Sequence, residues 1–128
     1  MIDLKSCFKF EEMTRNVTSE THTVCAKWIV PHDLSYLQGH FPNQPIVPGV
    51  AILDASVQLI TNAFGSCELS QVKSSKFLKP LLPGSTVTIE CRRVQDHEWT
   101  IDWSFRSLGT DGGTEPATEL IAKLLLVV

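Results

Sequence analysis

One stretch of the chain, GHFPNQPIVPGVAILDASVQL from Gly39 to Leu59, brings together residue types that can remove a proton beside a carbonyl group. His40 is a candidate general base. Asp54 is an acid within an apolar run, where an ionised carboxylate is costly unless it is paired, protonated or functional. Pro48 and Gly49 lead into a predicted helix, and a helix start offers unpaired N–H groups and positive potential. A base, an acid and a group that stabilises negative charge therefore fall within one short segment.

Each of these residues also has a structural interpretation. Asp54, Gln58 and Asn62 recur every four residues and share one stripe of the predicted helix, which either faces solvent or carries function. A lone histidine in a loop is more often a surface or structural residue, and the other three histidines receive only that interpretation. His40 differs because it stands next to Phe41 and a stiffening proline, a few residues before the helix start.

The composition indicates one globular domain over residues 1–128. The chain has 128 residues, 43% of them hydrophobic and 20% charged, which suffices for one sizeable core. The net charge of -3 does not favour a nucleic-acid partner, since such proteins usually carry a basic excess. No apolar run approaches the about 20 residues that span a membrane. The N-terminus lacks the apolar core of a secretory signal, so we expect a cytoplasmic protein.

The four cysteines, Cys7, Cys25, Cys67 and Cys91, stand far apart and form no CxxC pair. A zinc site normally brings two ligands close in the sequence. We therefore expect four reduced core thiols and no metal.

The hydrophobic pattern changes its period along the chain. A helix is predicted from about Pro48 to Phe64, stopped by Gly65, and its apolar residues cover nearly the whole circumference, which is typical of a buried helix. Short connections late in the chain indicate antiparallel pairs. The pattern predicts an α+β arrangement in which a curved antiparallel sheet of about five strands wraps around one central helix. The segments read as strands are about Lys5 to Met13, THTVCAKWIVP, QVKSSKFLKP, TVTIECRRV, EWTIDWSFRSL and TELIAKLLLVV, with LLPGS as a turn and GTDGGTEP as a loop.

A larger pattern surrounds the candidate base and acid. From Gly39 to Gln58 the chain resembles the signature of the 3-hydroxyacyl-[acyl-carrier-protein] dehydratases of type II fatty acid synthesis. That signature reads roughly G-H-F-P-x-x-P-x-x-P-G-x-x-x-x-[ED]-A-x-x-Q. The segments KFLKPLLPGSTVTIE and ATELIAKLLLVV are similar to later parts of that family, so the likeness covers most of the chain after Thr21. The residues in register with the signature are Gly39, His40, Phe41, Pro42, Pro45, Pro48, Gly49, Asp54, Ala55 and Gln58.

The resemblance implies a hot-dog fold and a homodimer, alone or in a trimer of dimers, with two active sites at the subunit interface. His40 would come from one subunit and Asp54 from the other. The implied substrate is a (3R)-3-hydroxyacyl chain held as a thioester on the phosphopantetheine arm of acyl carrier protein. The implied product is the trans-2-enoyl thioester, with no metal or redox cofactor.

The resemblance also implies a role for each site residue. His40 would take the C2 proton, and the N–H of Gly49 would polarise the thioester carbonyl. Asp54 would hold and protonate the leaving C3 hydroxyl, and an apolar environment favours the protonated acid that this needs. Gln58 would orient Asp54 by a hydrogen bond. Phe41 and Pro48 would support the site.

Three other functions stay open. Asp54 stands where the dehydratase-only branch of the family has Glu, and Asp resembles the branch that also isomerises trans-2 to cis-3 double bonds. A hot-dog acyl thioesterase also commonly uses an acid on the central helix, although without the His-Phe-Pro loop. A non-catalytic acyl-binding module is the third. The chain length of the substrate and the pathway, whether primary fatty acid or specialised lipid or polyene synthesis, are left open.

A basic segment suggests where an acidic carrier protein would dock. Residues 73–93 hold five basic residues against one acid, Glu90. Either these residues form a docking surface, or they are the solvated face of strands. The predicted docking residues are Lys76, Lys79, Arg92 and Arg93.

Overall fold

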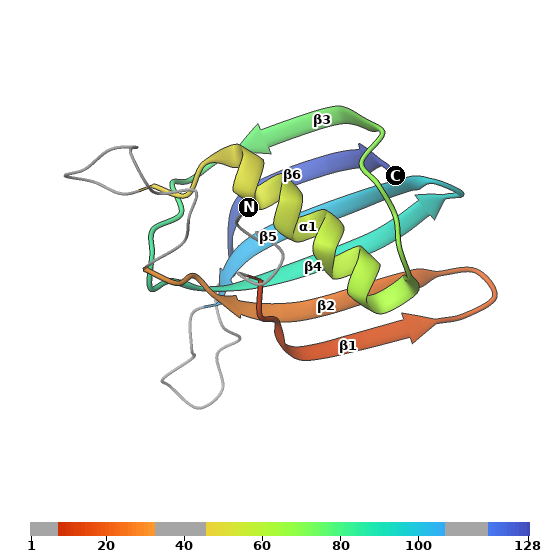
Figure 1. The fold of residues 1–128 in the computed structure, drawn as a ribbon, viewed down its shortest axis with the longest axis horizontal. Helices are drawn as coiled ribbons and strands as arrows, with labels where there is room; N and C mark the ends of the chain where they lie inside the picture. The colour runs from red at the N-terminus through yellow and green to blue at the C-terminus, as the bar shows by residue number, and fades with distance from the viewer. Residues whose placement is uncertain (1–7, 33–45, 107–117) are drawn as a thin grey trace.

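A computed structural model describes residues 8–32, 46–106 and 118–128. In this part of the chain, six strands form one antiparallel sheet and one helix lies across a face of it (Figure 1). The elements are β1 (Glu11–Val17), β2 (His22–Ile29), α1 (Gly49–Phe64), β3 (Gln71–Phe77), β4 (Thr86–Gln95), β5 (Glu98–Arg106) and β6 (Thr118–Val127).

In the strand order β1-β2-β4-β5-β6-β3, the edge strands are β1 and β3. The helix α1 begins over the β3 edge of the sheet and ends over the β1 edge (Figure 1). Residues 65–70 then lead back to β3, which pairs with β6 at the edge where the helix began. This is the hot-dog fold expected from the resemblance, with six strands in place of about five.

The start and end of α1 follow its sequence. Pro48 stands at the N-cap with an extended backbone, and its fixed φ suits the start of a helix. Gly65 follows the last helical residue with φ 107°, and its N–H donates to the carbonyl of Thr61 at 2.9 Å. Both predicted ends of the helix are confirmed. Among the described residues, no helix is long and apolar enough to cross a membrane.

The prediction that α1 is buried on all sides is wrong. Its residues at helical spacing toward the sheet are buried, but Val50 is 54% exposed and Leu53 and Val57 are half-buried. The reason is that the sheet covers only one side of the helix. The buried helical residues are Ala51, Ile52, Ala55, Ser56, Leu59, Ile60 and Ala63.

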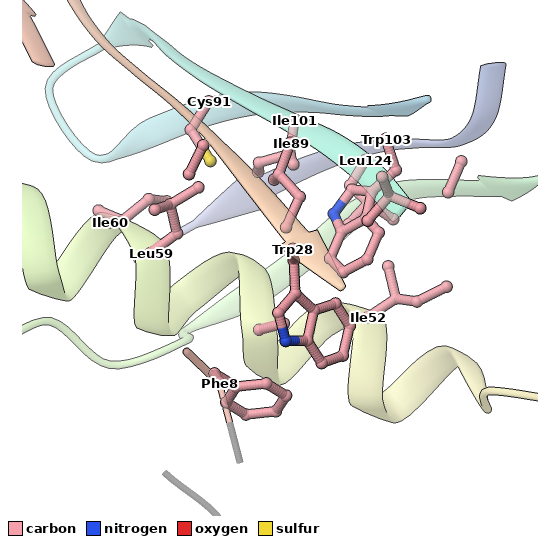
Figure 2. Packing of buried hydrophobic residues seen from close by; sticks show 14 of the residues in the cluster. Phe8, Trp28, Ile52, Leu59, Ile60, Ile89, Cys91, Ile101, Trp103 and Leu124 are labelled. Carbon is pink, nitrogen blue, oxygen red and sulfur yellow. The ribbon is translucent and has the colours of Figure 1, made fainter. Parts of the chain in front are cut away.

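The core lies between α1 and the inner face of the sheet (Figure 2). Trp28 of β2 and Trp103 of β5 meet edge to face, with ring centroids 5.7 Å apart. Ile89, Ile101 and other alternate residues of the central strands fill the space beside them. The predicted alternation of β2, β4 and β5 is confirmed.

The first strand was predicted too early in the chain. It was expected at about Lys5 to Met13, but β1 covers Glu11–Val17. Phe8 instead packs edge to face on Trp28, with centroids 5.5 Å apart. All seven β1 residues are exposed. Pairing with β2 therefore sets this strand, and its own sequence carries no alternating pattern that would reveal it.

The prediction of core thiols holds for only part of the cysteines. Cys91 is buried, and this burial raises the pKa of its thiol above the ordinary range. Cys67 is half-buried and packs against the core. Cys25 is half-buried on the outer face of the sheet, because its neighbours Val24 and Ala26 take the inner face. Cys7 and the predicted loop over residues 109–116 lie outside the described residues.

An ion pair fastens the β3 edge to the rest of the sheet. Lys73 lies at a bulge between Val72 and Ser74 and reaches Glu98 of β5, with Nζ and Oε1 2.5 Å apart. Gln95 donates to the other oxygen of this carboxylate at 2.6 Å. The hydrogen bonds from Lys73 and then Gln95 lower the pKa of Glu98. The pair thus connects two strands that β6 separates.

Candidate active site

The N-terminus of α1 presents the backbone N–H groups of its first turn. Ala51 and Ile52 donate to the carbonyl of Pro48 at 3.0 and 3.4 Å. No side chain of residues 8–32, 46–106 or 118–128 caps this end. Among the described hydrogen bonds, none takes the N–H of Gly49 or Val50. These two groups and the helix dipole are suited to a negatively charged oxygen.

Gly49 packs closely against Phe77 at the end of β3. A Cβ atom at this position would lie 2.9 Å from Cζ of Phe77. The tip of the Phe77 ring therefore rests against the helix backbone at its first residue. Phe77 is 49% exposed, and its role was not predicted from the sequence. Phe77 lies within the segment KFLKP, 28 residues after Gly49, so no periodic pattern in the sequence signals this contact.

A pocket of about 300 Å³ opens beside this helix start. The β3 end and the Pro80 segment form one wall, and the first turn of α1 forms the other. Lys79 is the charged member of an otherwise apolar lining. Such a pocket suits an acyl thioester, because an apolar wall takes the chain and the helix start takes the carbonyl oxygen. The lining consists of Ile46, Val47, Pro48, Gly49, Ile52, Phe77, Leu78, Lys79, Pro80 and Leu81.

Asp54 lies on the side of α1 that faces away from the sheet. Its neighbours Ala55 and Ser56 are buried toward the sheet, whereas Asp54 itself is half-buried. Val50, one turn earlier on the same side, is exposed. The acid is therefore not enclosed by the core of its own chain, contrary to the expectation for an apolar run.

The predicted polar stripe continues along this side of the helix. The amide nitrogen of Gln58 donates to Oδ1 of Asn62 at 2.7 Å. That bond directs Gln58 toward the C-terminal end of α1. The orientation of Asp54 by Gln58 stays a prediction.

The candidate base is not placed by the structure. His40 and Phe41 lie outside the described residues, as do the other signature residues from Gly39 to Pro45. The approach of His40 to Asp54 and Gly49 therefore stays a prediction. Pro48 and Gly49 are placed at the helix start, as expected.

The predicted basic docking surface does not form one cluster. Lys76 is on β3 and Arg92 on β4, and β5 and β6 lie between these strands. Arg92 pairs with Glu90 at 3.2 Å, and Lys79 pairs with Glu119 at 2.7 Å. Closeness in sequence misled the prediction, because the strand order separates β3 from β4 in space.

The structure also shows a polar contact beneath the site that the sequence did not reveal. Nε1 of Trp103 donates to Oγ of Ser56, a buried residue of α1. A serine within an apolar run was the available signal. As for metals, residues 8–32, 46–106 and 118–128 contain no group of three or more His, Cys, Asp or Glu side chains that could hold an ion.

Comparison with known proteins identifies a family. The model of a family described as ApeI-like, ApeI dehydratase, matches residues 16–114. A curated relative from Granulibacter bethesdensis, the 3-hydroxyacyl-[acyl-carrier-protein] dehydratase FabZ, is 32% identical over 102 residues. The match covers 72% of this chain but 59% of that relative, so the chain spans less than two thirds of its length.

Solved structures show the same fold. An uncharacterized protein from Erwinia carotovora subsp. atroseptica aligns with a TM-score of 0.72 at 26% identity, over 93% of this chain and 94% of that one. The dehydratase heterocomplex ApeI:P from Xenorhabdus doucetiae aligns with a TM-score of 0.68 at 22% identity, over 93% and 96%.

Proposed function

The chain belongs to the ApeI-like dehydratase family, and from that premise we propose that it removes water from (3R)-3-hydroxyacyl thioesters on acyl carrier protein. The product is the trans-2-enoyl thioester. The observation that carries the proposal is the start of α1, where the N–H groups of Gly49 and Val50 adjoin an apolar pocket. Asp54 follows on the same helix, little more than one turn later.

The first step removes the C2 proton. The imidazole of His40 takes this proton, and the electron pair of the C–H bond moves toward the thioester carbonyl. The negative charge that develops on the carbonyl oxygen is stabilised by the N–H of Gly49 and the positive end of the helix dipole. Pro48 supports this geometry because it fixes the backbone at the helix start. Phe41, which is next to His40 in the sequence, supports the imidazole.

The second step breaks the C3–O bond. The electron pair held on the enolate forms the C2–C3 double bond, and the hydroxyl leaves with a proton from the carboxyl of Asp54 as water. His40 and Asp54 then return to their starting protonation states by exchange with solvent. Gln58 assists by orienting Asp54. Loss of water leaves the overall oxidation state of the acyl chain unchanged, so the proposal needs no redox cofactor. The two steps, as proposed, also use no metal.

The working form is proposed to be a homodimer, alone or within a trimer of dimers. Phe77 and Leu78, which are 49 and 54% exposed, line the pocket at the start of α1, and Val50, the second residue of the helix, is 54% exposed. Exposed apolar surface of this kind marks an interface. A second copy placed against it would cover the outer side of α1, so one chain would supply His40 and the other Asp54.

A related but different chain is the competing partner for this surface. The ApeI:P neighbour is described as a heterocomplex, and a heterodimer would use the same edge. Native mass spectrometry of the purified chain alone distinguishes the two, because only the homodimer forms without a second protein.

Acyl carrier protein is the proposed donor of the substrate, in a cytoplasmic pathway. Lys76 and Lys79 are its proposed docking residues, because Lys79 lines the pocket and Lys76 lies on the adjacent strand β3. Arg92 and Arg93 lie on β4, with two strands between them and β3. Their contribution is therefore proposed to be smaller.

The test is incubation of the chain with a (3R)-3-hydroxyacyl carrier protein, followed by mass spectrometry. Loss of one water from the intact carrier-bound chain supports the proposal, and Asp54→Asn is the control that should abolish it. Release of free carrier thiol would instead show a thioesterase. Conversion of added trans-2-enoyl substrate to the cis-3 form would show isomerase activity. An unchanged substrate that stays bound would show an acyl-binding module.

A further inference from the structure

A buried hydrogen bond joins the middle of α1 to the sheet. Nε1 of Trp103 on β5 donates to Oγ of Ser56 at 2.9 Å, and both residues are 0% exposed. The hydroxyl of Ser56 donates in turn to the carbonyl of Ile52 at 2.7 Å. The contact is therefore a chain of two bonds from the sheet to the first turns of the helix.

This bond restrains the helix in a way that the surrounding core does not. Ile52, Leu59 and Ile60 also face the sheet, but apolar contacts have no preferred direction. A hydrogen bond weakens steeply away from its preferred angle. The described hydrogen bonds include one other from a strand to α1. In that bond Arg15 of β1 donates to the carbonyl of Ala63, at the C-terminal end of the helix. The bond of Trp103 thus fixes the rotation of α1 near its middle.

The rotation of α1 decides where Asp54 points. Asp54 and Ser56 are two residues apart, so their side chains leave the helix about 200° apart. Holding Ser56 against β5 directs Asp54 away from the sheet, to the side where Val50 is exposed. The same bond chain ends at Ile52, which lines the pocket together with Gly49.

We propose that Trp103 and Ser56 are positioning residues of the active site. They hold α1 at the one rotation that presents the Asp54 carboxyl to the substrate while the first turn keeps the N–H of Gly49 at the pocket. The inference rests on the proposed dehydration. Neither residue touches the pocket, so both act through the helix.

Two substitutions remove the bond in different ways. Trp103→Phe removes the donor and keeps an aromatic ring against Trp28, which lies 5.7 Å away. Ser56→Ala removes the acceptor and also the bond to Ile52. Trp99→Phe is the matched control, because Trp99 is on the same strand, is 4% exposed, and its side chain takes part in none of the described hydrogen bonds.

The experiment measures kcat and KM for a 3-hydroxyacyl carrier substrate, normalised to the folded fraction of each variant. Since a misplacement of about 1 Å can cost about 100-fold in rate, we expect kcat to fall about tenfold in Trp103→Phe and in Ser56→Ala, with KM changed less than about twofold. The double variant should be no slower than the slower single variant, because both changes break one bond. Trp99→Phe should keep the original kcat.

Three kinetic results would overturn the inference. They are full kcat in folded Trp103→Phe and Ser56→Ala, an equal loss in Trp99→Phe, or losses that multiply in the double variant. Hydrogen exchange supplies a readout that does not depend on catalysis. The amides of Ala51 and Ile52 should exchange faster in Trp103→Phe and Ser56→Ala than in Trp99→Phe, and equal exchange would contradict the inference. If the original protein does not dehydrate the substrate, the proposed function fails while the exchange comparison still tests the positioning.

Discussion

The two edges of the sheet contact opposite ends of α1, and the side chains of their edge strands β1 and β3 make different contacts. At the β1 edge, Arg15 donates to the carbonyl of Ala63 at 2.8 Å and lies over the ring of Phe64, so the edge caps the end of α1. Glu12 adopts φ 48° in a bulge and pairs with Lys27 of β2 at 3.3 Å. A bulge and charges on an edge strand discourage pairing with another chain.

The β3 edge also has a bulge, but Lys73 at this bulge pairs with Glu98 within the sheet. Lys73 is held by Glu98, and the strand then continues to Phe77, which packs on the first residue of α1. Leu78 follows and is 54% exposed. The edge that supports the candidate site is therefore the edge left open to a partner. The proposed active site and the proposed subunit interface thus share one side of this molecule, whereas the contacts of Arg15 and Glu12 at the other side hold α1 and β1 in place.

The largest expected effect comes from replacing a valine by glutamate on one edge strand but not on the other. Val72→Glu on β3 should break the dimer, because an unpaired charge buried in an interface costs about 3–5 kcal/mol, or about 100-fold or more in Kd. Activity should fall with the dimer. Val17→Glu on β1 is the matched control and should leave both unchanged. Native mass spectrometry and dehydration rates check the pair, and equal behaviour of the two variants would remove the distinction between the edges.

A second substitution tests the stabilising role of the β1 edge. Arg15→Ala should lower the free energy of unfolding by about 1–2 kcal/mol, through loss of a charged hydrogen bond and a cation–π contact. The dimer and kcat should persist. Urea denaturation measures the change, with Thr14→Ala, an exposed neighbour, expected within about 0.5 kcal/mol of the original protein. An unchanged midpoint for Arg15→Ala would show that the cap does not stabilise α1.

How much the sequence predicted depends on whether a feature is local. The ends of α1 and the alternation of β2, β4 and β5 were predicted because Pro48, Gly65 and the period of two act within a few residues. The position of β1 was missed, since that strand is defined by its partner. The uncovered side of α1 was missed too, because a sequence does not state that a sheet covers only one side.

The same distinction between local and long-range features applies to the candidate site. The helix start and Asp54 could be predicted from the motif spacing. The contact of Phe77 with Gly49 and the bond of Trp103 to Ser56 could not, because each joins residues 28 or more positions apart. The basic residues of β3 and β4 show the reverse error, since neighbours in the sequence are separated by the strand order.

A smaller effect concerns docking on the β3 side. Reversing charge in Lys76→Glu with Lys79→Glu should raise KM for carrier-bound substrate about threefold and spare a small thioester analogue, because surface charges chiefly guide association. Arg92→Glu with Arg93→Glu on β4 is the matched comparison and should change KM less. The same change for both substrates, or a larger effect from the β4 pair, would argue against docking at β3.

The smallest expected effect is the pH dependence of the stability that comes from the ion pair between Lys73 and Glu98. The pKa of Glu98 is lowered in the folded protein by Lys73 and Gln95, so its ion pair stabilises the fold above about pH 4.3, the ordinary pKa of Glu. This stabilisation is lost as the pH falls through the lowered value. Glu98→Gln should therefore be less stable than the original at pH 7 and nearly equal to it at strongly acidic pH. Thermal unfolding across this range measures the difference, and a gap that does not change with pH would contradict it.

In the proposed homodimer, each active site is assembled from two chains across the β3 edge. His40→Ala and Asp54→Asn should each lower turnover by at least about 100-fold, as loss of a positioned base or acid does. Two such inactive chains should nevertheless restore one another, because a mixed dimer has one site that receives an intact His40 and an intact Asp54.

Co-refolding equal amounts of the two variants and assaying dehydration tests this most directly. Random reassortment makes about half of the dimers mixed, each with one working site of two, so about a quarter of the original activity should return under two-fold symmetry. Native mass spectrometry confirms that mixed dimers are present. Recovery near a quarter is expected for sites shared between two chains, whereas mixed dimers without any recovery would show that each site is built within a single chain.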